Sequence, residues 1–222
     1  PPLAGVRLQD AVKVATPPVQ VKGRSLSNGR VQARLDSRGR LAALVVDDRP
    51  LELARAGAEL VLYPDQPSNF GPWDIDRHTL SLGKPVTTAA TIKPLTDGFA
   101  VSRKVGHSSR AVVRYRLKPG ASVLRITVEL DWHEEDALLK MRFPTAYRGR
   151  EVRSGTAFGS VMRPQLATTP QAETMWECPM SRWTTVSADA ERAGLFVVTE
   201  AKYGVSCREG ELGLSLLRSP LH

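Results

Sequence analysis

A chain of 222 residues is long enough for one large β domain or two small domains, with a sizeable buried core. Its hydrophobic fraction of 41% and charged fraction of 24% are ordinary for a globular protein, and no apolar run approaches the roughly 20 residues of a membrane-spanning helix. The net charge of +8 is compatible with an acidic partner. However, the arginines are spread singly along the expected strands, as at Arg34, Arg114 and Arg125, which favours a solvated polar face over a nucleic-acid or membrane-binding surface.

The first 23 residues differ in composition from the rest of the chain. They contain Pro1, Pro2, Pro17 and Pro18, and proline limits regular structure because it fixes φ and removes a backbone donor. We therefore expect residues 1–23 to be a linker, or a strand lent to a preceding domain, and residues 24–222 to form the packed domain. The chain starts without methionine or a recognisable signal peptide, so we expect a piece processed or cut from a longer protein, cytoplasmic by default.

Short segments with an alternating pattern follow. Residues 31–35 and 41–46 are separated by Ser37-Arg38-Gly39, which predicts a hairpin. Residues 51–62 could form a helix, but Gly57 weakens that interpretation. Further strands are expected over residues 86–92, 99–103, 195–199 and 212–217.

Residues 111–132 carry the clearest strand pattern of the chain. In its second half, apolar side chains from Leu124 to Trp132 alternate with polar ones, as in a half-buried antiparallel strand. Lys118-Pro119-Gly120 supplies the turn of a second hairpin. Many short strands and little helical periodicity predict an all-β fold, specifically a large antiparallel two-layer sandwich.

The most unusual segment is Tyr63-Pro-Asp-Gln-Pro-Ser-Asn-Phe-Gly-Pro-Trp-Asp-Ile-Asp76. Its fourteen residues include three prolines, three aromatic side chains and three carboxylates, which predicts a rigid loop rather than a central strand or a helix. Such a loop suits sugar recognition or a fixed contact between domains. Trp73 is expected to be a surface ring, whereas Trp132 follows the apolar face of its strand and is expected in the core.

Sequence motifs for catalysis or metal binding are weak. His133-Glu134-Glu135-Asp136-Ala137 begins like a zinc-binding helix, but Ala137 occupies the place of the second histidine. Asp74 and Asp76 are one of two sets of close carboxylates that could serve glycoside hydrolysis, which needs two carboxyl groups about 5 Å apart for retention. Close acids are also common as caps and arginine partners. Cys178 and Cys207 have no second pair and are expected to be free thiols.

Several segments occur in an order that is typical of one enzyme family. They are Asp65-x-Pro67 with Trp73-Asp-Ile-Asp76, Asp131-Trp-His-Glu134, Leu138-Leu-Lys-Met-Arg-Phe-Pro144, Gly155-Thr-Ala-Phe-Gly-Ser-Val-Met-Arg-Pro164, Trp176-Glu-Cys-Pro-Met-Ser-Arg-Trp183, Lys202-Tyr-Gly204 and Leu214-Ser-Leu-Leu-Arg-Ser-Pro220. This series resembles the C-terminal β region of family 38 glycoside hydrolases, the α-mannosidases, from about Ser27 to Pro220. Gly71 and Pro72 depart from the family pattern, in which an acid and an alanine usually precede the tryptophan.

The resemblance implies a division of labour within a longer enzyme. The enzymes of the family that this series resembles are retaining α-mannosidases, in which a zinc ion contacts the sugar. Their catalytic and metal-binding residues lie in an N-terminal domain, upstream of the region that this chain resembles. The resemblance therefore implies no catalytic residue, metal or cofactor in this chain, zinc in the missing catalytic domain, and an inactive fragment. It also implies a fold like the galactose-mutarotase supersandwich. The implied partners are the N-terminal catalytic domain and mannose-containing glycans, with no nucleic acid and no membrane.

Seven residues are candidates for contact with carbohydrate or with the catalytic domain: Asp65, Trp73, Asp74, Arg163, Arg182, Trp183 and Arg218. Arginine suits such contacts because its planar fork binds carboxylates through two hydrogen bonds. Two other functions stay open. One is a free-standing carbohydrate-binding module or a mutarotase-like sugar epimerase, with His133 beside acids. The other is a basic module for single-stranded nucleic acid, which the 6% aromatic content fits poorly.

Overall fold

A computed structural model describes residues 16–149, 151–188 and 193–220 of the chain. In these residues the regular structure is almost entirely β, and the strands form four antiparallel sheets. Within the described ranges the helical elements are one short 3-10 helix, η2 (Arg77–Ser81), and one short α-helix, α1 (Pro170–Glu173). The predicted all-β class is confirmed.

The first sheet has strand order β1-β2-β3-β4-β5. Its strands are β1 (Gln20–Lys22), β2 (Ser25–Ser27), β3 (Val31–Leu35), β4 (Leu41–Val46) and β5 (Arg49–Pro50). The β3–β4 hairpin has the predicted bounds, and Val31, Ala33 and Leu35 alternate as its buried side chains. Because β1 lies before the predicted boundary at residue 24 and pairs with β2 of the same chain, part of the expected linker belongs to this sheet. The boundary itself stays a prediction.

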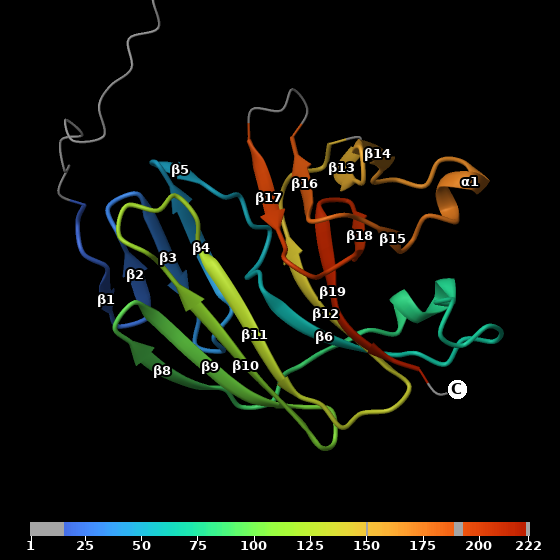
Figure 1. The fold of residues 1–222 in the computed structure, drawn as a ribbon, viewed down its shortest axis with the longest axis horizontal. Coiled ribbons are helices and arrows are strands. Elements are labelled where there is room, and N and C mark those ends of the chain that lie inside the picture. Colours follow the sequence, from blue (N-terminus) through green and yellow to red (C-terminus); the bar gives the residue numbers. More distant parts are fainter. Residues whose placement is uncertain (1–15, 150, 189–192, 221–222) are drawn as a thin grey trace, which may run out of the picture.

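The second sheet has strand order β11-β10-β9-β8. Its strands are β8 (Thr91–Leu95), β9 (Gly98–Val105), β10 (Ser109–Arg116) and β11 (Arg125–Asp131). The pairing of β10 with β11 confirms the second predicted hairpin, and Trp132 packs against the core as expected. Figure 1 shows β8–β11 in green and yellow beside the blue strands β1–β4.

The third sheet has six strands in the order β15-β18-β19-β12-β6-β7 and forms the centre of the molecule (Figure 1). Its strands are β6 (Glu59–Pro64), β7 (Lys84–Pro85), β12 (Ala137–Pro144), β15 (Cys178–Pro179), β18 (Gly204–Arg208) and β19 (Glu211–Ser219). Seven of the eight residues of β12 are buried, because this strand lies between β6 and β19 in the middle of the sheet.

The fourth sheet has strand order β14-β13-β16-β17 and lies next to α1 at one end of the molecule (Figure 1). Its strands are β13 (Glu151–Thr156), β14 (Gly159–Pro164), β16 (Trp183–Ser187) and β17 (Gly194–Val198). One large hydrophobic cluster includes residues from all four sheets, for example Leu35, Val101, Leu139 and Val186. The sheets therefore share a core.

Two sequence predictions were wrong. Residues 51–62 form no helix. Residues 53–57 contain bends and isolated bridges, with Gly57 paired to Leu41, and β6 begins at Glu59. The expected strand over residues 86–92 does not form as one strand. Residues 86–90 lie between β7, which ends at Pro85, and β8, which begins at Thr91. In the first case the apolar run belongs to a buried strand, and periodicity alone does not separate a buried strand from a buried helix segment.

Candidate functional site

The proline-rich loop, residues 65–76, connects β6 to η2 and is held by its own hydrogen bonds. Ser68 donates to Asp76 from its backbone nitrogen at 3.0 Å and from its hydroxyl at 2.7 Å. The backbone nitrogen of Trp73 donates to the carbonyl of Phe70 at 2.7 Å, and Phe70 has a positive φ of 55°. The hydrogen bonds of Ser68 lower the pKa of Asp76. The loop is therefore structured, as the sequence predicted.

Arg218 of β19 fastens this loop to the central sheet, an arrangement that we call the Arg218 clamp. Its Nε donates to Asp65 Oδ2 at 2.5 Å and its Nη2 to Asp65 Oδ1 at 3.1 Å. The same guanidinium donates to the carbonyls of Pro72 and Gly71, both at 2.9 Å, and to that of Asp74. Asp65 is completely buried, so this ion pair is shielded from water and its partners are fixed.

The clamped loop presents two aromatic rings to solvent. Trp73 is 89% exposed and Phe70 is 77% exposed. A further contact comes from Trp176, whose indole Nε1 donates to the carbonyl of Ile75 at 2.8 Å. The result is a rigid support that holds exposed apolar surface in one place, which is what a binding or docking surface requires.

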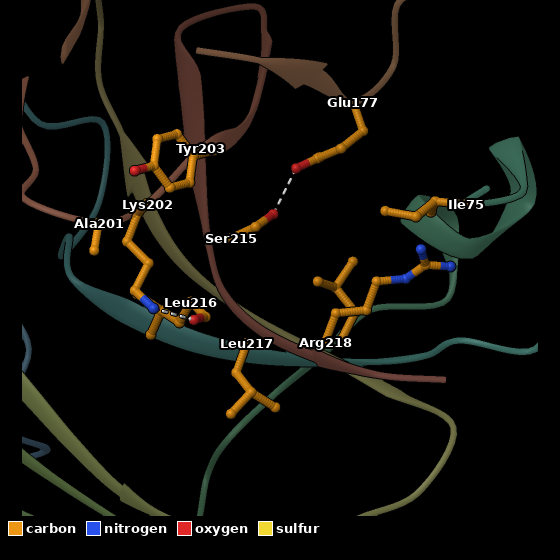
Figure 2. Close-up of a pocket in the computed structure, with 10 residues that line it drawn as sticks. Ile75, Glu177, Ala201, Lys202, Tyr203, Ser215, Leu216, Leu217 and Arg218 are labelled. Atoms are coloured by element: carbon orange, nitrogen blue, oxygen red, sulfur yellow. Dashed lines mark hydrogen bonds between the residues drawn. The ribbon is translucent and has the colours of Figure 1, made fainter. Parts of the chain in front are cut away.

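A shallow depression of about 250 Å³ lies beside the clamp. Figure 2 shows Arg218 and Ile75 on one side of it, Lys202 and Tyr203 on the other, and Glu177 above. Lys202 donates to the carbonyl of Leu216 at 2.7 Å. The depression therefore combines an exposed tyrosine ring with charged groups of both signs.

A buried ion pair supports the wall of the depression. Lys140 of β12 is fully buried and pairs with Glu177, and its Nζ also donates to the hydroxyl of Ser206 at 2.8 Å. The hydroxyl of Ser215 donates to the other carboxylate oxygen of Glu177 at 2.5 Å. Burial lowers the pKa of Lys140, and the attraction of Glu177 offsets only part of that effect. Lys140 and Ser215 thus fix the position of the Glu177 carboxylate.

The structure divides the predicted site residues into two groups. Asp65, Trp73, Asp74 and Arg218 come together in and around the clamp, where Asp74 is exposed and accepts a hydrogen bond from the backbone nitrogen of Ile75. Asp65 itself is buried and contacts Arg218.

The other predicted residues, Arg163, Arg182 and Trp183, lie on or beside the fourth sheet. Arg163 is in β14, and its Nη1 is buried without a hydrogen-bond partner among the described residues. Arg182 is exposed and has a positive φ of 65°, and Trp183 begins β16 and packs against Phe196.

Sequence reasoning did not select Lys140, Glu177 or Tyr203, although all three lie within the motifs quoted for the family resemblance. Lys140 lies in β12, Glu177 directly precedes β15 and Tyr203 directly precedes β18. These strands are far apart in the chain and come together only in the folded sheet. The one local signal is a lysine at position 140, inside an otherwise apolar part of a strand. An internal charge of this kind indicates a buried partner.

The described residues contain no group of three or more His, Cys, Asp or Glu side chains that could hold a metal ion. Cys178 and Cys207 are free thiols, and burial raises both their pKa values, that of Cys207 to about 12. No helix in the described ranges has the length and apolar character needed to cross a membrane.

The fold and the site together define an all-β module that holds an exposed, aromatic-bearing loop on a rigid sheet. The family model described as "Glycosyl hydrolases family 38 C-terminal domain" matches residues 26–222. The chain belongs to this family, which confirms the resemblance inferred from its motifs.

Similar proteins agree with this assignment. The chain is 31% identical to "Alpha-mannosidase 2C1" of Homo sapiens over 205 residues, covering 88% of this chain and 20% of that protein. It is 24% identical to "Alpha-mannosidase G" of Dictyostelium discoideum over 209 residues, 88% of this chain and 19% of that protein. The fold is similar to the crystal structure of an α-mannosidase from Enterococcus faecalis V583, with a TM-score of 0.68, 12% identity, and coverage of 88% of this chain and 26% of that one. The chain thus spans about a fifth of its curated relatives.

Proposed function

We propose that this chain is the non-catalytic C-terminal β region of a retaining, zinc-dependent α-mannosidase that hydrolyses α-mannosides in glycans. The family match over residues 26–222 carries the proposal, supported by the α-mannosidase names of the curated relatives. In this proposal, residues outside the chain supply the zinc site and the catalytic carboxylates. We also propose that the sheets of this region form a two-layer sandwich like the galactose-mutarotase supersandwich.

The role that we assign to the chain is to brace the catalytic domain. The Arg218 clamp supports this role because five hydrogen bonds from Arg218 hold the loop in place, while the Trp73 ring on that loop stays 89% exposed. A tryptophan ring held this way is well suited to docking, since it supplies a large apolar surface with little loss of conformational entropy.

An activity assay tests the division of labour. The full-length parent enzyme is expected to hydrolyse an aryl α-mannoside and to lose that activity when a chelator removes zinc. The 222-residue chain is expected to be inactive with or without added zinc. Zinc-dependent turnover by the chain alone would contradict the non-catalytic role, and a parent enzyme without activity on α-mannosides would contradict the assigned reaction.

The substitution Trp73→Ala tests the bracing role. In the parent enzyme it should lower the unfolding free energy by about 2 kcal/mol, as expected for a docked tryptophan. In the chain alone the ring is exposed, so the change should stay within about 0.5 kcal/mol. Urea unfolding of both proteins measures the two values, and Val123→Ala, at another exposed residue, is the control. Equal effects in parent and chain would argue against docking at Trp73.

A further inference from the structure

The fourth sheet has one face in the core and one face open to solvent. Along β13, β16 and β17 the side chains of Val152, Val186 and Leu195 are buried. The alternate side chains point away from the core. Strand pairing places them in two rows: Met162, Arg153, Thr185 and Phe196 cross all four strands, and Trp183 lies opposite Val198 in the next row. We call these six residues the open face.

The open face is more apolar than a solvated sheet surface needs to be. Met162, Phe196 and Val198 are between 60% and 66% exposed, and Trp183, partly exposed, contacts Phe196. The side chain of Arg153 is held within the surface, because its Nε donates to the hydroxyl of Ser160 at 2.8 Å. Trp183, Phe196 and Val198 adjoin one another on β16 and β17, whereas Met162 lies at the far edge of the row, beyond Arg153 and Thr185. Adjoining exposed apolar side chains of this size on a sheet mark an interaction surface.

The geometry of the aromatic pair favours a protein partner over a sugar. The rings of Trp183 and Phe196 are 5.7 Å apart and tilted by 48°, so they do not form one flat platform on which a pyranose could stack. Val198, which lies opposite Trp183, offers only methyl groups, and these cannot form the hydrogen bonds that sugar hydroxyls need. Tilted rings among aliphatic side chains pack well against other apolar side chains.

We propose that the open face docks a segment of the full-length polypeptide outside this chain, within the catalytic part of the enzyme. This inference rests on the proposed function and specifies which surface of the chain meets its partner. The chain spans about a fifth of its curated relatives, so most of a relative's length lies outside the matched region and is available to cover this face. The occupant is expected to present apolar side chains, with a carboxylate near the exposed Arg182 at the margin.

Cysteine labelling tests the proposal with a closely matched control. Val198 in the open face is 66% exposed, and Val123 in the β10–β11 connection is 65% exposed, so Val198→Cys and Val123→Cys create equally accessible thiols in the chain alone. The native thiols give little background because burial raises the pKa values of Cys178 and Cys207. Each variant is made in the full-length enzyme and in the chain, reacted with a maleimide at neutral pH, and followed by mass spectrometry of the peptide that carries the new cysteine.

In the chain, the two cysteines are expected to react at similar rates. In the full-length enzyme, position 198 should react at least about tenfold more slowly than position 123, because docking covers it. Equal rates in the full-length enzyme would overturn the proposal. The proposal would also be overturned if position 198 reacted slowly in the isolated chain and its reaction rate fell further as the protein concentration rose. That result would indicate a second copy of the chain as the occupant. Labelling does not depend on the reaction catalysed, so the mannoside assay tests the proposed function separately.

Discussion

At the scale of single residues, the clamp depends on the shape of arginine. Arg218 satisfies both oxygens of Asp65 and three backbone carbonyls with one planar group. The ammonium of lysine has three donors on a flexible stem and cannot reproduce this fork. Asp65 is completely buried, so any loss of its partner leaves a carboxylate without compensation.

The substitution Arg218→Lys should therefore destabilise the chain by about 2 kcal/mol, because several charge-assisted hydrogen bonds are lost while the charge is kept. Urea unfolding measures this change. Limited proteolysis should also show faster cleavage within residues 65–76. The control is Arg208→Lys at an exposed position of β18, for which a change within about 0.5 kcal/mol is expected. A stable Arg218→Lys variant with a protected loop would show that the clamp is not what orders the loop.

At the scale of elements, the β9–β10 hairpin is tied to the end of β11 by Glu134. The carboxylate accepts hydrogen bonds from the backbone nitrogens of His107, Ser108 and Ser109, and from the hydroxyl of Ser109. Burial acts to raise the pKa of Glu134, but these hydrogen bonds together outweigh it and lower the pKa to about 2. The ionised form of Glu134 therefore stabilises the folded state.

This arrangement predicts a defined pH dependence of stability. The folded pKa of Glu134 is lower than its usual value of 4.5, so its contribution is complete above about pH 4.5 and is lost as pH falls towards about 2. The variant Glu134→Gln should be less stable than the parent chain by about 1 kcal/mol at pH 7, and the difference should vanish near pH 2. Urea unfolding across this pH range measures it, with Glu135→Gln at the exposed neighbouring residue as the control. A difference that is constant with pH would contradict the assignment.

The elements that sequence predicted best are those whose pattern is local. The β3–β4 and β10–β11 hairpins combine alternating side chains with a nearby turn, and both formed as expected. Residues 51–62 were misread because their apolar run ends in the buried strand β6, whose partner β12 begins 73 residues after Pro64, at Ala137. When the partner strand is this far away in the chain, the local sequence does not show whether an apolar segment will form a buried strand or a buried helix.

At the scale of the whole molecule, the β3–β4 turn joins the first sheet to the second. The hydroxyl of Tyr115 in β10 donates to the carbonyl of Gly39 at 3.1 Å, and Arg103 in β9 donates to the carbonyl of Arg38. Gly39 has a φ of 73°, and a Cβ built on it would lie 2.4 Å from a methyl group of Val101. The two sheets meet so closely here that a larger residue would force Val101 or the turn to shift.

The substitution Gly39→Ala should thus carry two costs, one for its positive φ and one for the clash with Val101. Gly23 isolates the first cost, because it has a φ of 61° and its Cβ would meet nothing within 4 Å. Gly23→Ala should destabilise the chain by about 1 kcal/mol, and Gly39→Ala by a further 1–3 kcal/mol or so. Thermal or urea unfolding of the two variants compares them. Equal losses would show that the turn can move away from β9 without cost.

The candidate site was predictable only in part. The composition of residues 63–76 indicated a rigid loop with an exposed Trp73, and both features are present. The clamp could not be derived from local patterns, because Arg218 and Asp65 are 153 residues apart and meet across β12. The open face was also hidden, since it arises from the register of four strands and not from any one of them.

The reach of Arg218 also bears on the order in which the polypeptide matures on the ribosome. Strands β6 and β12 can pair as soon as residue 144 has emerged, but β19 is completed only at Ser219, close to the last described residue. Until then the backbone carbonyls of Gly71 and Pro72 lack the donor that organises them. The surface that bears Trp73 is consequently organised later in synthesis than the β6–β12 pair, only after β19 has emerged.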